Sequence, residues 1–519
     1  MQKDILTNLN PDQLKAVVYE KSPLLVLAGA GSGKTKVLTT RAAWFIQTGR
    51  AKSENVLLLT FTNKAANEMK ERILSMIGDV PSYSGTFHSF CVRVLRRDGN
   101  KIGISPDFVI YDTQDQKAAV TEVIESIGLS PDSYKPAQFL PAISDAKNQM
   151  MTPLQYGEIA NGEMQEKVFS VYNQYAKYLE KANALDFDDL LLRAVELFVR
   201  DNETLTKWQE QLTHILVDEW QDTNKIQYKL TRQLVGKTGN LTAVGDASQS
   251  IYSWRGADFR NINNLRSDYA NIGVVNLEQN YRSTEQILEA ANSVISKNSS
   301  HPILKLWTEN GRGERIKIFG AQNGLDEAKY VSDKVRELSR QGYNFADMAI
   351  LYRTNAQSRT IEEALLHTGV PYVIVGGIKF YERAEVKDIL ACLRLLANRN
   401  DGVSEKRVLT LGKRRWDKFV EYREGLEGGV ENHTTLELMD AVVAKTNYLE
   451  KYARESEENL AKLENIKELR SVAMEFPVLH DFLENVALVQ QEETVNEKSF
   501  GDNSREGRVT LMTLWFLVA

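Results

Sequence analysis

PLLVLAGAGSGKT, residues 23–35, joins an apolar run to a glycine-rich turn and then to a helical pattern. In that setting the glycines let backbone N–H groups wrap phosphate groups at the start of the helix. Lys34 can reach the outer phosphates, and Thr35 can ligate Mg²⁺. A glycine-rich turn without this role would not need the lysine and threonine that follow it. We therefore interpret residues 28–35 as a phosphate-binding loop.

An acidic motif further along supplies a complementary feature. HILVDEWQD, residues 214–222, is an apolar strand pattern that ends in Asp218 and Glu219. The aspartate can hold Mg²⁺ through water, and the glutamate can polarise an attacking water as general base. Taken alone, an acidic pair after a strand is more often a helix cap or a solvated loop. With the phosphate loop upstream it indicates a hydrolase, and nothing else in the sequence resembles the acceptor site of a kinase.

Repeated strand, loop and helix patterns predict a parallel sheet covered by helices. Between about residues 106 and 184 strand signals vanish, which predicts a helical insertion. A second pattern of the same class begins at about residue 276, with IKIFGA, MAILYR and YVIVGG as its strands. A long helical and charged stretch follows, until RVTLMTL, residues 508–514, brings back one strand that should rejoin the second sheet.

Composition bounds the class of protein further. The 519 residues are 42% hydrophobic and 26% charged, as in ordinary globular proteins. The N-terminus has no apolar signal core and no apolar run is long enough to span a membrane, so we expect a cytoplasmic protein. Cys91 and Cys392 are too few for a disulfide framework or a zinc site and should be small core residues. The net charge of −6 does not exclude a local basic groove.

The chain resembles the UvrD/Rep/PcrA group of superfamily 1 DNA helicases, in an ordered series of motifs over residues 1 to 395. The motifs are LNPDQ, AGAGSGKT, LTFTNKAANEMKER, GTFHSF, ALDFDDLL, VDEWQDTN, VGDASQSIYSWRGAD, LEQNYRST and ILYRTNAQSR. The resemblance implies an α/β chain of two RecA-like P-loop parallel-sheet domains, each with a mainly helical insertion. The first domain would span residues 1–107 and 185–275, with residues 108–184 as its insertion. The second domain would span residues 276–385 and 506–519, with residues 386–505 as its insertion.

The resemblance also implies an ATP site with Mg²⁺. Gln13 would read the adenine edge and Tyr281 would stack on the base, although a lone glutamine is usually a surface residue and a tyrosine usually core. Arg282 looks like the family's arginine finger from the second sheet, and Gln249 would sense the γ-phosphate. Without the motif, Arg282 would be read as an exposed arginine at a helix entry. The implied nucleotide-binding residues also include Gly29, Gly31, Gly33, Lys34, Thr35 and Lys36.

A single-stranded DNA track is the second implied site. Such tracks stack bases on aromatic rings and bind phosphates without reading sequence. The implied DNA-binding residues are Phe61, Thr62, Asn63, Thr86, His88, Phe187, Tyr252, Trp254, Arg255 and Arg353. By periodicity alone, Phe61 and Phe187 would be assigned to the core. The resemblance implies a monomeric 3′-to-5′ helicase of DNA repair or replication, which acts on single strands and on single-strand/duplex junctions and has protein partners there.

The sequence departs from the family near its end. Trp515 stands where the family carries a histidine, and we expect the chain to break off inside the second domain, by truncation or a frame change at about Leu514. The second sheet should then be incomplete and have an exposed edge. The alternative to a helicase is a truncated relative that binds ATP and single-stranded DNA without productive unwinding. In the second insertion, Lys413, Arg414 and Arg415 either meet duplex phosphates or form a solvated basic run.

Overall fold

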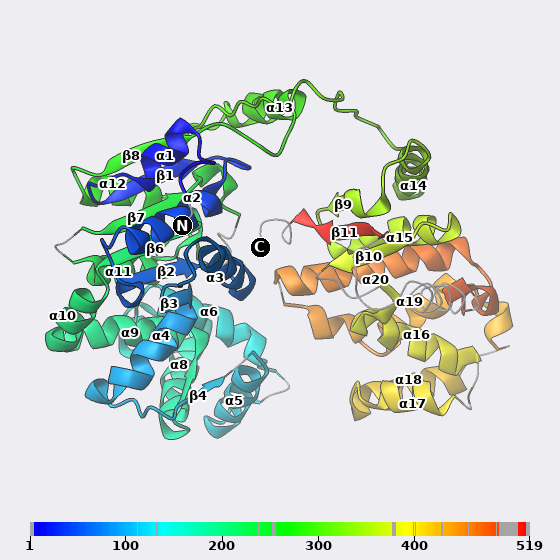
Figure 1. Ribbon diagram of the computed structural model, residues 1–519. Helices are drawn as coiled ribbons and strands as arrows, with labels where there is room; N and C mark the ends of the chain where they lie inside the picture. Colours follow the sequence, from blue (N-terminus) through cyan, green and yellow to red (C-terminus); the bar gives the residue numbers. More distant parts are fainter. Residues whose placement is uncertain are drawn as a thin grey trace. The chain divides into compact units, whose positions relative to one another are not determined.

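The chain forms two compact units, residues 1–317 and 318–519, and each is described by itself. The computed structural model is shown in Figure 1. It describes residues 5–111, 113–130, 133–236, 239–251, 256–375, 380–397, 399, 401–426, 429–454, 456–483, 485–486 and 507–514. In this part of the chain no helix is long and apolar enough to cross a membrane.

A six-stranded parallel sheet organises the first unit, with strand order β3-β2-β6-β7-β1-β8. Its strands are β1 (Leu24–Ala28), β2 (Val56–Thr60), β3 (Tyr83–Thr86), β6 (His214–Val217), β7 (Leu241–Gly245) and β8 (Gly273–Leu277). Strands β1, β2 and β7 are buried along their whole length, as expected for a sheet covered on both faces. The predicted parallel α/β class is therefore confirmed.

Helices cover both faces of this sheet. They are α1 (Pro11–Val17), α2 (Lys34–Gln47), α3 (Asn63–Ile77), α4 (Phe87–Asp98), α9 (Phe187–Arg200), α10 (Asn202–Gln211), α11 (Lys225–Val235) and α12 (Asn261–Asp268). Helix α13 (Glu285–Ile295) follows β8 and contributes no residue to the two core clusters of this sheet. Successive side chains of each strand point to opposite faces of the sheet, so the core has two parts, one on each face. Leu25 and Leu27 pack with α4, α9 and α11, whereas Leu24 and Val26 pack with α2 and α3. Cys91, predicted to be a core residue, is buried in the first of these clusters.

His214, the first residue of β6, is a pH-sensitive part of this core. Its ring packs on Phe45, with 4.3 Å between the ring centroids. Burial, followed by the charge of Arg41, lowers the pKa of His214 to about 4. An unfolded histidine titrates near pH 6.5, so between these values the unfolded state binds more protons and stability falls as the pH falls.

We expect a His214→Gln variant to lose less stability on acidification than the wild type. Since the ring is partly exposed, the difference in unfolding free energy between about pH 7 and about pH 4.5 should be about 1–2 kcal/mol. Urea unfolding followed by the fluorescence of the buried Trp208 and Trp220 measures it. Equal pH slopes in the two proteins would contradict the assignment.

The helical insertion of the first unit is present as predicted, in α5 (Thr113–Ser126), α6 (Pro136–Asn148), α7 (Pro153–Ile159) and α8 (Glu163–Lys181). Two short strands, which the sequence did not predict, pair with each other where the insertion begins and ends. Strand β4 (Val109–Tyr111) pairs in parallel with β5 (Ala184–Asp186). Three residues are too few to show a period of two, so a strand signal was not visible there.

The second unit contains a three-stranded parallel sheet with order β10-β11-β9. Its strands are β9 (Ala349–Tyr352), β10 (Tyr372–Val375) and β11 (Val509–Thr513), with helices α14 (Gly324–Arg340) and α15 (Ser358–His367). Strand β11, red in Figure 1, lies between the other two. The prediction that the returning strand rejoins the second sheet is confirmed. Trp515 lies outside the described residues.

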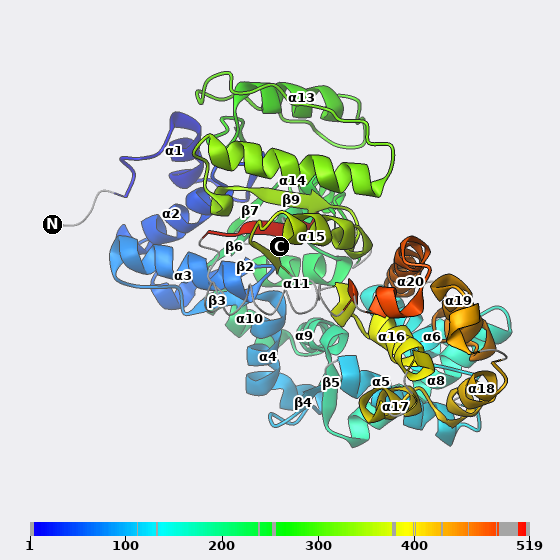
Figure 2. The same ribbon diagram turned by 90° about the vertical axis from the view of Figure 1, so that its right-hand side faces the viewer.

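Helices α16 (Ala384–Ala397), α17 (Gly402–Leu409), α18 (Lys413–Glu424), α19 (Thr435–Lys445) and α20 (Glu457–Glu475) follow β10. Figure 2 shows them gathered to one side of β9, α14 and α15. They share a separate apolar core, in which Cys392 is buried as predicted. The basic residues Lys413, Arg414 and Arg415 begin α18.

One predicted strand is absent from the structure. Residues 316–321, IKIFGA, pair with no strand in the described chain, and Ile318 is 96% exposed. Phe319 stacks on Tyr330 of α14, with 4.0 Å between ring centroids. Strand β8 joins the first sheet, and the first compact unit extends to residue 317. The predicted domain boundaries stay predictions.

Candidate functional site

The loop between β1 and α2 has the backbone that phosphate binding needs. Gly31 and Gly33 have φ values of 68° and 87°, in the left-handed region that favours glycine. Gly33 caps α2, and Lys34 is the first residue of that helix. The N–H groups of the first turn therefore have no helical partners and can donate to an anion.

Lys34 is held between two polar side chains that arrive from the neighbouring strands. Its Nζ lies 2.8 Å from Glu219 Oε2, after β6, and 3.0 Å from Gln249 Oε1, after β7. Gln249 Nε2 in turn donates to Asp246 Oδ2 at 2.7 Å. The sequence-predicted residues Lys34, Glu219 and Gln249 thus meet at the carboxyl ends of three adjacent strands, where open α/β sheets bind ligands.

Gln221 closes these contacts into a ring, and sequence reasoning did not select it. Its side chain is fully buried, its Nε2 donates to Glu219 Oε2 at 2.8 Å, and its Oε1 accepts from Asp246 N at 3.0 Å. We name Lys34, Glu219, Gln221, Asp246 and Gln249 the catalytic ring. The only available signal was the position of Gln221 two residues after the acidic pair.

Two buried carboxyl groups beside the catalytic ring are suited to a cation. Burial, and then the neighbouring Glu219, raise the pKa of both Asp218 and Asp222 to about 7. Asp218 Oδ1 and Asp222 Oδ1 are buried and accept no hydrogen bond in the described chain. Buried oxygens without donors are costly, and a hard divalent cation satisfies them. Asp222 was not selected from the sequence.

Backbone strain supports a functional role for the acidic pair. Glu219 has φ 47° and ψ 48°, which is uncommon for a residue with a Cβ atom. Such conformations cost of the order of 1–3 kcal/mol and cluster at functional sites. Here the conformation turns the chain after β6, so that Glu219 faces Lys34 while Asp218 stays buried.

A turn after β8 packs directly on the phosphate loop. Asn280 is buried, its Nδ2 donates to Ala30 O at 2.6 Å, and its Oδ1 accepts from the N–H groups of Arg282 and Ser283. Tyr281 N donates to Gly31 O at 2.9 Å. A Cβ on Gly31 would lie 2.7 Å from Asn280 Nδ2 and 2.8 Å from Arg282 Cβ, so only glycine fits.

This placement differs from the expectation for the arginine. Arg282 was expected from the second sheet, but it lies in the first unit, held to the loop through Asn280. Its side chain is exposed and forms no ion pair within the described residues. The guanidinium is thus available to an anion on the loop. Asn280 is a further candidate for the site that the sequence did not single out, because a buried and a surface asparagine look alike in sequence.

We expect Asn280→Ala to lower kcat/KM for ATP by about 10- to 100-fold, because small displacements of charged groups cost that much. The variant loses the bonds that fix Arg282 beside the loop. A phosphate-release assay measures the effect. Asn55→Ala is the matched control, since Asn55 also ties a loop to a backbone carbonyl, Gln211 O, before β2. Equal rates for the Asn280 variant and this control would refute the role.

The other nucleotide residues surround the same loop. Gln13 is buried and donates through Nε2 to Ser32 O at 2.9 Å. Tyr281 is 48% exposed, and its hydroxyl accepts from Asn10. The Thr35 hydroxyl has no hydrogen-bond partner among the described residues, whereas Lys36 Nζ donates to Asn8 O. Their predicted roles toward adenine, Mg²⁺ and phosphate stay predictions.

The DNA residues of the first unit follow β2 and β3 at the same edge of the sheet. Thr62 and Thr86 cap α3 and α4 through their hydroxyls, so both are fixed at strand ends. Asn63 is exposed at the first position of α3, and Phe61 is half-buried. Tyr252, Trp254 and Arg255 lie outside the described residues. Arg353 lies in the second unit, where its N–H donates to Gln357 Oε1.

Phe187 is not a core residue, contrary to its periodicity. It is 46% exposed at the first position of α9, and the His88 ring meets it edge-on at 5.8 Å. Burial lowers the pKa of His88, so a neutral imidazole faces the aromatic ring. The exposed ring offers the stacking surface that single-strand binding uses.

A buried ion cluster supports Phe187, and sequence reasoning missed it. Lys147 of α6 lies 2.6 Å from Asp186 Oδ2 and 2.8 Å from Asp189 Oδ1. Asp186 caps α9 in a reciprocal capping box with Asp189. The lysine therefore ties the helical insertion to the turn that presents Phe187. Such a contact links residues that are distant in sequence, so no local sequence pattern predicts it.

A phosphate loop, an acidic pair after a neighbouring strand and a free arginine define a nucleoside-triphosphate hydrolase of the P-loop class. Comparison with protein families agrees. The UvrD/REP helicase N-terminal domain matches residues 9–270, and the UvrD-like helicase C-terminal domain matches residues 275–492. The chain belongs to the UvrD/REP helicase family and is an ATP-hydrolysing enzyme of the helicase class.

Individual relatives are similar over nearly the whole chain. The ATP-dependent DNA helicase PcrA of Bacillus subtilis (strain 168) is 40% identical over 99% of this chain, which covers 76% of that protein. PcrA of Staphylococcus aureus (strain Mu50) is 39% identical over 98% of this chain, which covers 76% of it. PcrA of Staphylococcus epidermidis is 40% identical, with coverages of 94% and 72%.

Proposed function

We propose that this protein is an ATP-dependent DNA helicase that moves 3′ to 5′ along single-stranded DNA, as a monomer, in DNA repair or replication. The observation that carries the proposal is the shared edge of the first sheet. The catalytic ring follows β1, β6 and β7, and Thr62 and Thr86 follow β2 and β3 of the same sheet. The exposed Phe187 follows β5, in the small β4-β5 sheet, and its ring meets His88 of α4, two residues after Thr86. Relatives named ATP-dependent DNA helicases, and the family match, support it.

Hydrolysis of ATP would use the catalytic ring as it stands. A bound γ-phosphate competes with Glu219 for Lys34 Nζ, which now lies 2.8 Å from the carboxylate. Once Lys34 turns to the phosphate, Glu219 loses its positive partner and becomes a stronger base for the attacking water. Substrate binding would thereby prepare the base. Arg282 would neutralise the charge that develops on the phosphate oxygens.

The fit to Mg²⁺ rests on the two aspartates. Thr35 and Asp218 would hold the ion, with Asp222 close by, and the ion would neutralise charge on the outer phosphates. The buried oxygens of Asp218 and Asp222 that accept no hydrogen bond match this donor set.

Gln249 connects the nucleotide site to the chain segment that leads to the proposed DNA track. It bonds to Lys34 and Asp246 and stands one residue before Ser250, at the end of the described segment 239–251. When Lys34 turns to a phosphate, Gln249 Oε1 would lose the hydrogen bond that it now accepts from Lys34 Nζ. The Gln249 side chain could then move with Lys34 toward the nucleotide. A shift there would be passed along the chain to the segment that carries Trp254, which the family resemblance assigns to the DNA track.

The experiment is ATP hydrolysis by the purified chain, with and without single-stranded DNA, with Lys34→Ala as the blank. Strand separation of duplexes with a 3′ or a 5′ tail then tests direction. DNA-stimulated turnover with unwinding of the 3′-tailed duplex supports the proposal. DNA binding without stimulation would overturn it and leave a protein that binds ATP and single-stranded DNA without productive unwinding.

A further inference from the structure

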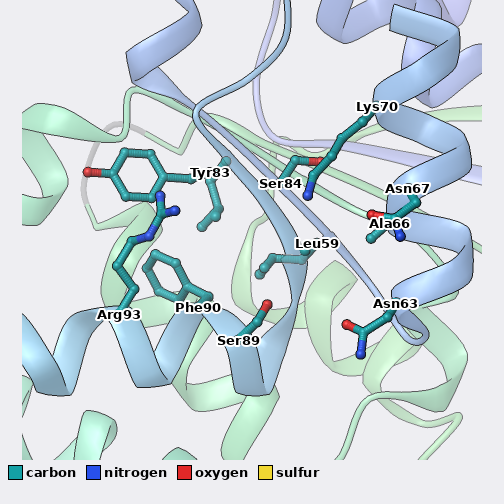
Figure 3. A pocket seen from close by; sticks show the side chains of 12 residues that line it. Leu59, Asn63, Ala66, Asn67, Lys70, Tyr83, Ser84, Ser89, Phe90 and Arg93 are labelled. Atoms are coloured by element: carbon teal, nitrogen blue, oxygen red, sulfur yellow. The ribbon is translucent and has the colours of Figure 1, made fainter. Parts of the chain in front are cut away.

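A cavity of about 230 Å³ opens between α3 and α4, beside the edge strand β3. Figure 3 shows Phe90 and Arg93 of α4 on one side and Asn63, Asn67 and Lys70 of α3 on the other, with Ser84 of β3 between them. Leu57 and Leu59 of β2 also line it and are fully buried. The cavity therefore combines an apolar wall with a polar, basic rim. We call it the edge cavity.

The charge of the edge cavity favours an anion. Its described lining includes Lys70 and Arg93 and no carboxylate. Three other cavities of the described chain each include acidic side chains, among them Asp333, Glu431 and Glu464. Amide and hydroxyl groups of Asn63, Asn67 and Ser89 complete a rim of the kind that holds phosphates.

One cation of the edge cavity is fixed in place. Arg93 Nη1 donates to Ser82 O at 2.9 Å, and its guanidinium lies 4.8 Å above the Tyr83 ring. The remaining donors of this guanidinium are held ready without further loss of side-chain freedom. Lys70 forms no ion pair with any described residue, so its charge is not neutralised within the described part of the chain.

Two further features indicate that the edge cavity is suited to a polar ligand. Ser84 Oγ is buried and has no hydrogen-bond partner in the described chain. A Cβ on Gly85 would lie 2.4 Å from Ser89 Oγ, which donates to Thr86 O, so glycine leaves room for that hydroxyl beside the strand. A polar atom without a partner and a glycine that admits a hydroxyl both fit a polar ligand.

We propose that the edge cavity binds one nucleotide unit of the single strand, with its phosphodiester between Lys70 and Arg93 and its sugar or base against Leu59 and Phe90. The cavity is smaller than typical sites for drug-sized ligands, which suits one nucleotide. It adjoins the proposed track, since Asn63 belongs to both and Thr86 ends the strand that lines it. The inference rests on the proposed function and extends its DNA path.

The test measures single-stranded DNA affinity by fluorescence anisotropy over a series of salt concentrations. Lys70→Ala should weaken binding of a long oligonucleotide roughly five- to tenfold and lower the salt slope by about 0.7, the value for one phosphate on a single strand. Lys64→Ala is the matched control: Lys64 is exposed on the same helix, has the same charge, and lies outside the cavity lining. It should leave both quantities unchanged.

Asn67→Glu provides a second variant that keeps the helix, because glutamate is a good helix former and Asn67 is exposed. It places a negative charge in the edge cavity and should weaken binding more than Lys70→Ala does. Phe187→Ala tests the track itself. Suppose that Phe187→Ala weakens single-stranded DNA binding, whereas the Lys70 and Asn67 variants bind it as well as Lys64→Ala does. The proposed nucleotide site in the edge cavity is then wrong, and the proposed function stands.

Two other outcomes also overturn the inference. If the wild type binds no single-stranded DNA, the proposed function fails together with it. If Lys70→Ala lowers affinity for deoxythymidine monophosphate but not for the oligonucleotide, the edge cavity is a site for free nucleotides. Weakened oligonucleotide binding in both cavity variants, with a reduced salt slope and an unchanged Lys64→Ala control, supports it.

Discussion

Lys34→Ala is expected to lower the DNA-stimulated rate of ATP hydrolysis by about 10²- to 10³-fold, the usual effect of removing a group that stabilises transition-state charge. The Lys34 ammonium group lies within 3.0 Å of both Glu219 and Gln249, so its loss opens the catalytic ring at two contacts. It also removes the cation that would meet the outer phosphates. Steady-state phosphate release at saturating DNA measures the change.

A surface lysine separates this effect from a general loss of charge. Lys207→Ala removes a lysine on α10 that pairs with Glu203 and is 58% exposed, and it should leave the rate unchanged. A thermal unfolding curve for each variant shows whether the fold persists. If Lys34→Ala kept more than about a tenth of the wild-type rate, the catalytic ring would not hold the reacting phosphates.

Glu219→Gln is expected to lower the same rate by about 10²- to 10⁴-fold while ATP binding changes little, because an amide cannot take a proton from water. The substitution preserves size. Its amide oxygen still accepts from Lys34 Nζ, and from Gln221 Nε2, which now donates to Glu219 Oε2 at 2.8 Å. Single-turnover hydrolysis reports the chemical step, and titration with a fluorescent ATP analogue reports binding.

Glu203→Gln is the control for the loss of a carboxylate, since Glu203 is exposed on α10, pairs with Lys207 there and makes no contact with the catalytic ring among the described hydrogen bonds and ion pairs. Hydrolysis by Glu219→Gln at a rate near that of this control would show that another group activates the water. Asp222 would then be the next candidate, because it is buried beside Glu219 and its pKa is raised to about 7.

The parts of the site that could be predicted are those that local sequence encodes. Lys34 follows a glycine-rich turn, and Asp218 with Glu219 follows an apolar run, so residue type and the preceding strand were sufficient. Thr62 and Thr86 are similar cases, because each ends a strand and begins a helix. In a parallel sheet such positions share one edge, whatever the strand order is.

The residues that could not be predicted act through contacts between distant segments. Gln221, Asn280 and Lys147 are buried polar residues whose partners come from other strands or helices. A sequence gives their type, whereas their role depends on which groups the fold brings within hydrogen-bonding distance. Phe187 shows the converse, since its apolar periodicity suggested burial and its position at a helix start leaves it exposed.

Strand pairing limits prediction in the same way. IKIFGA has strand composition, but in the described chain it pairs with no strand, and Phe319 packs on Tyr330. Strands β4 and β5 have only three residues each, too few for a periodic signal, and they form because the ends of the insertion meet. β-propensity describes fitness for a pleated surface, and the presence of a partner decides the outcome.

The central position of β11 has a consequence for the order of folding. Strands β9 and β10 both pair with β11 and not with each other, and residues 376–508 separate β10 from β11. The second sheet therefore cannot assemble during synthesis until the last of these segments has left the ribosome. By then the cluster of α16 to α20, which has its own core, can already have folded. High contact order in so small a sheet predicts that its formation is the slow step of folding in this unit.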